Sequence, residues 1–278
     1  MLKRVSIFIY GVVSYVVFLA TFLYALCFVG NFIVPRTIDG MPRTDLTTAI
    51  FTNLALLLVF AAQHSVMARP AFKRFLTRFV PEPAERSTYV LASSLALILL
   101  FALWQPLGGT VWEITDPTFR AVMYALFGFG WGLVLISTYL INHFDLFGLR
   151  QVWLSLRNRP FTPLKFGTPG PYKLIRHPLY FGWLFAFWAT PLMSTTHLLF
   201  ALATTAYILI AIRLEERDLV ASLGDDYRRY RERVPMLVPF SKPRQSPKKT
   251  RFATPVPHTA VLTGTQTSMH SRPDDSCV

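Results

Sequence analysis

Charged residues are scarce in this chain. Asp, Glu, Lys and Arg together make up 15% of its 278 residues, whereas hydrophobic residues make up 53%. Soluble domains carry a charged fraction nearer to about one quarter. The shortage of charge therefore excludes an ordinary soluble protein and favours a chain that is embedded in lipid.

Cysteine is scarcer still, with two residues in the whole chain. Cys27 lies within a long apolar stretch and Cys277 is next to the last residue, so neither has a plausible partner. This excludes a disulfide framework and a thiolate metal site. Nothing in the spacing of the histidines sets up a three-histidine site either, and we expect no metal.

Long apolar runs are what the chain has in abundance. The first four are long enough to cross about 30 Å of hydrocarbon, and the first is too long for a cleaved signal peptide. The last two are shorter and are separated by Met193-Ser194-Thr195-Thr196, which indicates a helical hairpin that barely spans. We expect an all-α polytopic membrane protein with about five to six transmembrane helices, from runs at 5–34, 46–66, 88–106, 118–141, 179–193 and 196–212.

The basic excess has an uneven distribution. With the N-terminus placed in the cytosol, all but three of the 28 Lys and Arg residues fall on the cytosolic side, the exceptions being Arg36, Arg43 and Arg120. This is the positive-inside bias, so it predicts that both termini are cytosolic. It also explains the net charge of +13 without a nucleic-acid partner.

The organisation follows from these runs. Residues 1–240 form one predicted membrane domain, whose half from about 142 to 240 carries most of the polar motifs. The segment 241–278 is basic, rich in Pro, Ser and Thr, and lacks apolar periodicity, so it is predicted to be a disordered cytosolic tail.

Ionisable residues gather at the predicted cytosolic helix ends. His64 closes the second run, His143 closes the fourth, His177 opens the fifth, and Glu215-Glu216 closes the sixth. Ionisable groups at membrane depth are expensive and usually face a cavity. A single one would be an interfacial anchor, but several from different helices at one depth favour a site. The loop 142–178, rich in Pro, Gly and aromatic residues, is predicted to be structured and to cap that site.

The segment Arg176-His177-Pro178 has a clear physical interpretation. Pro178 is suited to the first position of a helix, and a helix start presents free N–H groups that bind a carboxylate or phosphate. Glu215 and Glu216 can accept hydrogen bonds from amines or hydroxyls. S-adenosylmethionine carries both kinds of group, although other zwitterionic or nucleotide ligands fit the same logic.

At these residues the chain resembles the membrane methyltransferases of the isoprenylcysteine carboxyl and phospholipid N-methyltransferase type. The resemblance implies that S-adenosylmethionine binds at the cytosolic face, through Arg176, His177, Tyr180, Gly182, Glu215 and Glu216. It covers about 165–240 and is carried by Gly170-Pro171-Tyr172, Arg176-His177-Pro178-x-Tyr180-x-Gly182, Glu215-Glu216-x-x-Leu219, Tyr227-x-x-Tyr230 and Val234-Pro235.

The N-terminal two-thirds resembles a narrower group, the nurim-like family, which includes bacterial enzymes that methylate methanethiol. This resemblance implies the conversion of methanethiol to dimethyl sulfide and a place in a bacterial inner membrane. No obligate protein partner is evident. The matching segments are Gln63-His64-Ser65-Val66-Met67-Ala68-Arg69 with Lys73, Glu85-Arg86-Ser87-Thr88-Tyr89-Val90-Leu91, Trp104-Gln105-Pro106 with Val111-Trp112, and Asn142-His143-Phe144-Asp145-Leu146-Phe147-Gly148-Leu149.

A small thiol is mostly protonated at neutral pH, so its methylation needs a base or a cation that stabilises the thiolate. His64 and His143 are the candidate bases, with Asn142 and Asp145 as residues that would orient His143. Arg69, with Lys73 and Arg86, is the candidate for stabilising the anion.

Three alternatives stay open from the sequence. The acceptor could be a prenylcysteine carboxylate or a lipid amine. Membrane sterol reductases that use NADPH share an Arg-His-x-x-Tyr-x-Gly-like segment, although no matching C-terminal reductase signature is found here. The chain could also be a structural, non-enzymatic nurim-like protein, in which case it would not bind S-adenosylmethionine.

Overall fold

The computed structural model describes residues 1–162 and 166–241, which belong to one compact unit, Met1–Arg244. Apart from Ser241, the predicted tail lies outside the described residues. The elements in chain order are α1 (Leu2–Gly30), α2 (Leu46–Met67), α3 (Pro70–Leu76), η1 (Glu82–Ala84), α4 (Glu85–Leu103), β1 (Thr110–Glu113), α5 (Pro117–Ile141), α6 (His143–Leu146), α7 (Leu149–Leu156), η2 (Gly170–Lys173), α8 (Pro178–Trp188), β2 (Leu192–Ser194), α9 (Thr195–Leu223) and α10 (Asp225–Arg233).

Five helices in the described residues are long and apolar enough to cross a membrane: α1, α2, α4 extended by η1, α5 and α9. The prediction of an all-α integral membrane protein is confirmed. Short polar residues start several of these helices. Asp45 accepts a hydrogen bond from the Thr48 amide at the start of α2, and Asp116 caps α5 in front of Pro117.

The first arm of the predicted hairpin is shorter than expected. Helix α8 ends at Trp188 and is roughly 16 Å long at 1.5 Å per residue, which is about half of the hydrocarbon thickness. Pro191 explains this end, because proline cannot donate to the preceding turn and its ring clashes with the helix. The chain then continues as β2, which pairs antiparallel with β1. The helical part of this arm is therefore shorter than the apolar run 179–193, and a β-strand completes the arm.

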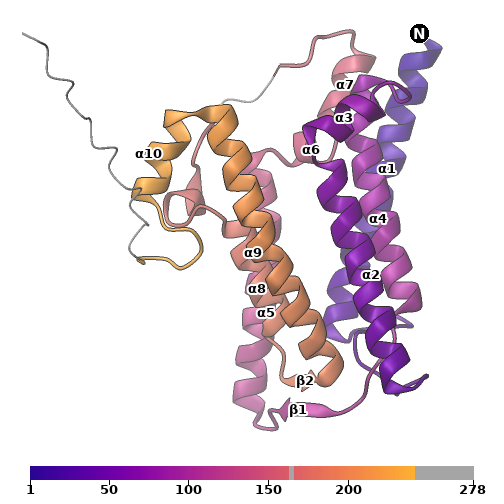
Figure 1. Ribbon diagram of the computed structural model, residues 1–278, viewed down its shortest axis with the longest axis vertical. Coiled ribbons are helices and arrows are strands. Elements are labelled where there is room, and N and C mark those ends of the chain that lie inside the picture. Colours follow the sequence, from indigo (N-terminus) through magenta and orange to yellow (C-terminus); the bar gives the residue numbers. More distant parts are fainter. Residues whose placement is uncertain (163–165, 242–278) are drawn as a thin grey trace, which may run out of the picture. The chain divides into compact units, whose positions relative to one another are not determined.

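The long helices pack in two groups, which Figure 1 shows side by side: α1, α2 and α4 in one, and α5, α8 and α9 in the other. Within the second group, α5 and α8 approach very closely. A Cβ atom on Gly182 would lie 2.8 Å from the carbonyl oxygen of Gly130, and one on Gly130 would lie 2.7 Å from that of Gly182. Any larger residue at either position would push the two backbones apart.

We call the two ends of the bundle the N-terminal end, where α1 begins, and the ribbon end, where β1 pairs with β2 (Figure 1). The largest apolar core lies toward the ribbon end and joins the two helix groups. It includes Phe28 of α1, Leu100 of α4, Phe127 of α5 and Phe200 of α9. The polar residues singled out above lie toward the other end.

Candidate functional site

Three buried ionisable residues meet where α8 begins. The Arg176 Nε atom donates to Glu216 Oε1 at 2.6 Å, and His177 Nε2 lies 3.2 Å from the same oxygen. Arg231 Nε lies 3.4 Å from the other carboxylate oxygen. Arg176 and Glu216 are each 8% exposed and His177 is 5% exposed. We call Arg176, His177 and Glu216 the strut.

The strut fastens the segment that follows α10 onto the start of α8. Nη1 of Arg176 donates to the carbonyl oxygen of Val234 at 2.5 Å, and the backbone amide of Arg176 donates to the carbonyl oxygen of Pro235 at 2.9 Å. The His177 amide donates to Met236 at 3.2 Å. The Glu216 carboxylate is therefore already engaged by protein donors on both oxygens, which is the condition for burying such a charge.

Glu215 has different surroundings, although it is the next residue along α9. Its side chain is exposed, and its carboxylate lies beside the hydroxyl of Tyr180 and within electrostatic range of Tyr172. Successive helical residues point about 100° apart, so one carboxylate faces the strut while the other faces these tyrosines. Of the two, Glu215 is available to a ligand.

Hydroxyl groups without partners surround this position. The Ser137, Tyr172 and Tyr227 hydroxyl oxygens are buried and form no hydrogen bond of normal geometry among the described residues, although Ser137 and Tyr172 lie near each other. Burial is the main cause that raises the pKa of Tyr172 and of Tyr227, so both phenols stay protonated and able to donate. Burial also raises the pKa of Tyr230 to about 12, and its hydroxyl donates to the Tyr172 carbonyl at 2.6 Å. Unmade hydrogen bonds of this kind are costly, and a polar ligand would satisfy them.

The first helix group brings His64 to the same neighbourhood. The Tyr89 hydroxyl of α4 lies 2.9 Å from His64 Nε2, and Ser93 Oγ lies 3.2 Å from Nδ1. Tyr180 is within electrostatic range of Tyr89 and of Tyr207 as well as of Glu215. The Tyr207 hydroxyl lies 3.1 Å from Ser65 Oγ, the residue after His64. The predicted residues His64, Tyr180 and Glu215 therefore belong to one continuous polar region.

His143 lies apart from this region, against α1. Thr138 Oγ1 donates to the Leu135 carbonyl, so it accepts from His143 Nδ1 at 2.9 Å, and Nε2 accepts from the Tyr15 hydroxyl at 2.8 Å. The ring also stacks on Tyr139 at 4.3 Å. Both nitrogens of His143 are occupied by protein groups. Burial lowers its pKa and keeps it neutral. Asn142 caps the Asp145 amide, and Asp145 pairs with Arg150 at 2.8 Å, so neither contacts the imidazole nitrogens.

Arg69 and Gly182 make contacts between helices. Arg69 forms an ion pair with Asp218 of α9 at 2.7 Å and donates to the Ser65 carbonyl at 3.3 Å. It thereby ties the end of α2 to α9. Gly182 is covered by α5, as described above. Their roles in catalysis and cofactor binding stay predictions.

Sequence reasoning missed the tyrosines that connect the two halves. Tyr89 and Tyr207 were not singled out as site residues, and Tyr172 and Tyr227 entered only as parts of a motif. A signal for Tyr89 was present, because Arg86, Tyr89 and Ser93 follow at three and four residues and so share one face of a helix. No comparable pattern marks Tyr207.

Comparison with known proteins fits this arrangement. Residues 119–224 match the model of the phospholipid methyltransferase family. The chain is 53% identical over 239 residues to a methanethiol S-methyltransferase of Crocosphaera subtropica, which covers 86% of this chain and 94% of the relative. A protein of the same name from Mycobacterium tuberculosis is 52% identical, covering 86% of this chain and 98% of the relative.

Nurim of Bos taurus is a more distant relative, 32% identical over 176 residues, which are 60% of this chain and 66% of nurim. No solved structure matches the chain. The fold, the family model and these relatives define an integral membrane methyltransferase. More narrowly, the chain belongs to the family of the methanethiol S-methyltransferases.

Proposed function

We propose that this protein transfers a methyl group from S-adenosylmethionine to a small thiol, and that methanethiol is the thiol and dimethyl sulfide the product. The observation that carries the proposal is the meeting of the two helix groups at one polar region. Tyr180 lies within electrostatic range of Glu215 in its own group and of Tyr89 in the other, and Tyr89 hydrogen-bonds to His64.

The tyrosine-rich part of this region fits the cofactor. When bound, S-adenosylmethionine supplies an electrophilic methyl group on a sulfonium cation. Glu215 can accept hydrogen bonds from its ammonium or ribose hydroxyl groups, and the Tyr172 and Tyr227 hydroxyls have hydrogen bonds to give. Tyrosine ring faces attract a cation, and a carboxylate nearby strengthens that attraction.

The strut shapes the cofactor region indirectly, and its Glu216 carboxylate does not contact the cofactor. Its carboxylate is taken up by Arg176, His177 and Arg231. The strut instead holds the segment after α10 against α8, so it fixes one wall of the cofactor region. The N-terminal turn of α8, which follows the strut, leaves backbone N–H groups for the cofactor's carboxylate.

His64 is the residue that takes the thiol proton. Transfer of the methyl group forms one carbon–sulfur bond on the thiol and breaks one on the donor sulfonium, which would leave as a neutral thioether. The thiol proton is released, and the neutral imidazole accepts it. The Tyr89 hydroxyl at 2.9 Å from Nε2 orients the ring.

The side of the membrane follows from the charges. Arg36, Arg43 and Arg120 lie at the ribbon end, in loops or at the start of α5. The other Lys and Arg residues within 1–162 and 166–241 lie toward the N-terminal end. The positive-inside bias supports a cytosolic N-terminal end, so the site faces the cytosol, where S-adenosylmethionine is made.

The test is methyl transfer by the purified full chain in detergent, with methyl-labelled S-adenosylmethionine and methanethiol. Labelled dimethyl sulfide in the headspace is expected. Glu215→Gln should weaken cofactor binding about tenfold or more, since it removes a charged hydrogen-bond acceptor. Glu232→Gln, the same change at an exposed residue of α10, should have no effect.

Cofactor binding without labelled dimethyl sulfide would refute methanethiol as the substrate, and label in added lipid or prenylcysteine would identify the alternative acceptor. Failure of the folded protein to bind S-adenosylmethionine would refute the cofactor assignment.

A further inference from the structure

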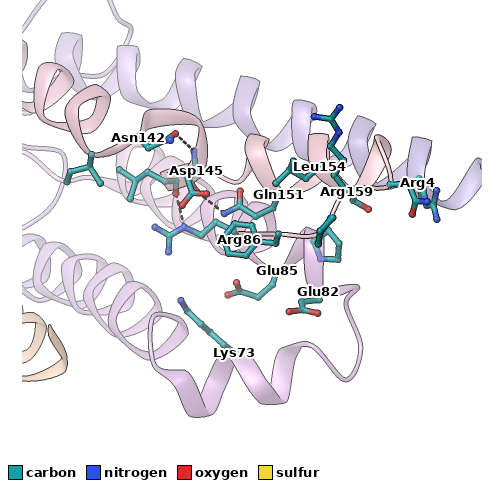
Figure 2. A pocket seen from close by; sticks show the side chains of 17 residues that line it. Arg4, Lys73, Glu82, Glu85, Arg86, Asn142, Asp145, Gln151, Leu154 and Arg159 are labelled. Atoms are coloured by element: carbon teal, nitrogen blue, oxygen red, sulfur yellow. Dashed lines mark hydrogen bonds between the residues drawn. The ribbon is translucent and has the colours of Figure 1, made fainter. Parts of the chain in front are cut away.

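A polar cavity lies at the N-terminal end of the bundle, and none of the strut residues lines it. Its volume is about 1020 Å³, and residues of α3, η1, α4, α6 and α7 form its walls together with Arg4 near the start of α1. Figure 2 shows side chains of both charge signs around this hollow. The cavity is much larger than a small thiol requires, and its size matches sites for ligands of headgroup or nucleotide size.

The lining carries a surplus of positive charge. Arg4, Lys73, Arg86 and Arg159 line the cavity, and none of them forms an ion pair within residues 1–162 and 166–241. Glu82 and Glu85 oppose them in part, whereas the lining residue Asp145 is neutralised by Arg150 at 2.8 Å. The cavity therefore favours a ligand with an anionic group.

Two acceptors inside the same cavity require hydrogen-bond donors. The Oε1 atoms of Glu85 and Gln151 are buried and have no partner in the described part of the chain. The side-chain amide nitrogen of Gln151 already donates a hydrogen bond to the Asp145 carbonyl at 3.0 Å. Arg86 Nε likewise donates to the Leu146 carbonyl at 2.7 Å (Figure 2). A matching ligand thus has hydroxyl or ammonium donors beside its anionic group.

The surroundings of the cavity indicate a membrane interface. Trp153 of α7 and Phe161 on the cavity wall are both about half exposed, and Arg157 lies over the Trp153 ring at 5.3 Å. Tryptophan beside basic residues is typical of the headgroup layer. The apolar helix α1 starts at the cavity and offers a surface for acyl chains.

We propose that this cavity binds the headgroup of an anionic glycerophospholipid that carries free hydroxyl groups. The phosphodiester lies beside Lys73 and Arg86, Arg4 supplies positive charge from the opposite side of the cavity, and the headgroup hydroxyls donate to Glu85 and Gln151. A soluble phosphodiester shares this chemistry but lacks the acyl chains that α1 accommodates. The proposal does not depend on the identity of the methyl acceptor.

The test uses the purified full chain in detergent and native mass spectrometry with three probes. These are phosphatidylglycerol, phosphatidylmethanol (the same charge without headgroup hydroxyls) and the soluble glycerophosphoglycerol. The double variant Arg4→Gln/Lys73→Gln should lose about tenfold or more in affinity for phosphatidylglycerol. The control Lys3→Gln/Arg74→Gln removes the same charges from the neighbouring positions of α1 and α3, which do not line the cavity, and should bind normally.

Glu85→Ala should abolish the preference of the wild-type protein for phosphatidylglycerol over phosphatidylmethanol. Equal losses in the two double variants would overturn the proposal, because they would show attraction to the basic surface alone. Equal binding of both lipids by the wild type would overturn the hydroxyl contacts, and equal binding of glycerophosphoglycerol would overturn the lipid as the source.

Discussion

Glu215 and Glu216 are neighbours in sequence, yet the regions that they serve differ in every physical respect. Around Glu216, the buried Arg176 and His177 lie against one carboxylate oxygen, and the partly exposed Arg231 pairs with the other. Around Glu215, tyrosine hydroxyls and an exposed carboxylate leave hydrogen-bonding capacity unused. A saturated carboxylate holds structure together, whereas an unsaturated one is available for a ligand. The number of hydrogen-bond and ion-pair partners of each carboxylate therefore distinguishes a structural glutamate from a ligand-binding one, which the residue type alone does not.

Breaking the strut should have the largest effect. Glu216→Gln leaves the Arg176 charge buried without its counter-ion, which costs about 3 kcal/mol of folding free energy or more. Thermal unfolding in detergent measures this loss. Glu215→Gln should leave the unfolding temperature unchanged, and so should Asp225→Asn, which removes an exposed ion pair with Arg228. Equal shifts for Glu216→Gln and Glu215→Gln would contradict the distinction between them.

Variants of the two candidate bases, His64 and His143, should show the next largest difference, in the rate of methyl transfer. His64→Gln should lower the rate of methyl transfer by about a hundredfold, since it removes the proton acceptor from the polar region. His143→Gln should leave the rate per folded molecule near that of the wild type, because His143 is held against Tyr15 of α1, apart from the polar region that contains Tyr180 and Glu215. Single-turnover assays on variants of verified fold measure both rates. A larger loss for His143→Gln would reverse the assignment.

The smallest expected effect is the loss of stability at acidic pH that His143 causes. Burial lowers the pKa of His143 below its ordinary value of about 6.5, so the unfolded chain binds a proton more readily than the folded one. The contribution of neutral His143 to the free energy of unfolding is therefore fully present above about pH 6.5. It is lost as the pH falls toward the pKa that His143 has in the folded protein. The unfolding temperature measured between about pH 7.5 and pH 5 should fall more in the wild type than in His143→Gln. Parallel curves would show that His143 does not titrate in this range.

Much of the fold could be predicted from the sequence, because long apolar runs have one stable solution in lipid. The five long helices lie where the hydropathy places them. The short α8 and the β1–β2 ribbon could not be predicted in the same way. They depend on pairing between segments about eighty residues apart, Thr110 with Ser194 for example, and on the end that Pro191 imposes on α8.

The site was predictable in part. The Arg-His-Pro segment and the glutamate pair do come together, as their places at helix ends indicated. The sequence could not say which glutamate Arg176 would take, because a rotation of α9 would exchange the two. It also could not separate His64 from His143, since both close a helix, and only the packing shows that one faces tyrosines of both groups while the other is held against α1.

The two ends of the bundle are joined by different forces, and this has a consequence for motion. Toward the ribbon end, Phe28, Phe127 and Phe200 belong to one apolar core shared by both helix groups. At the other end, the links between α2 and α9 include the half-exposed Arg69–Asp218 pair and the Ser65–Tyr207 hydrogen bond, each worth about 1 kcal/mol or less. Beside this seam, α6 and α7 continue from α5 and pack against α1, so at the N-terminal end the α2–α9 seam is the part that separates most readily. Opening of this seam would expose the polar region, and for the function proposed above it would give the product a way out.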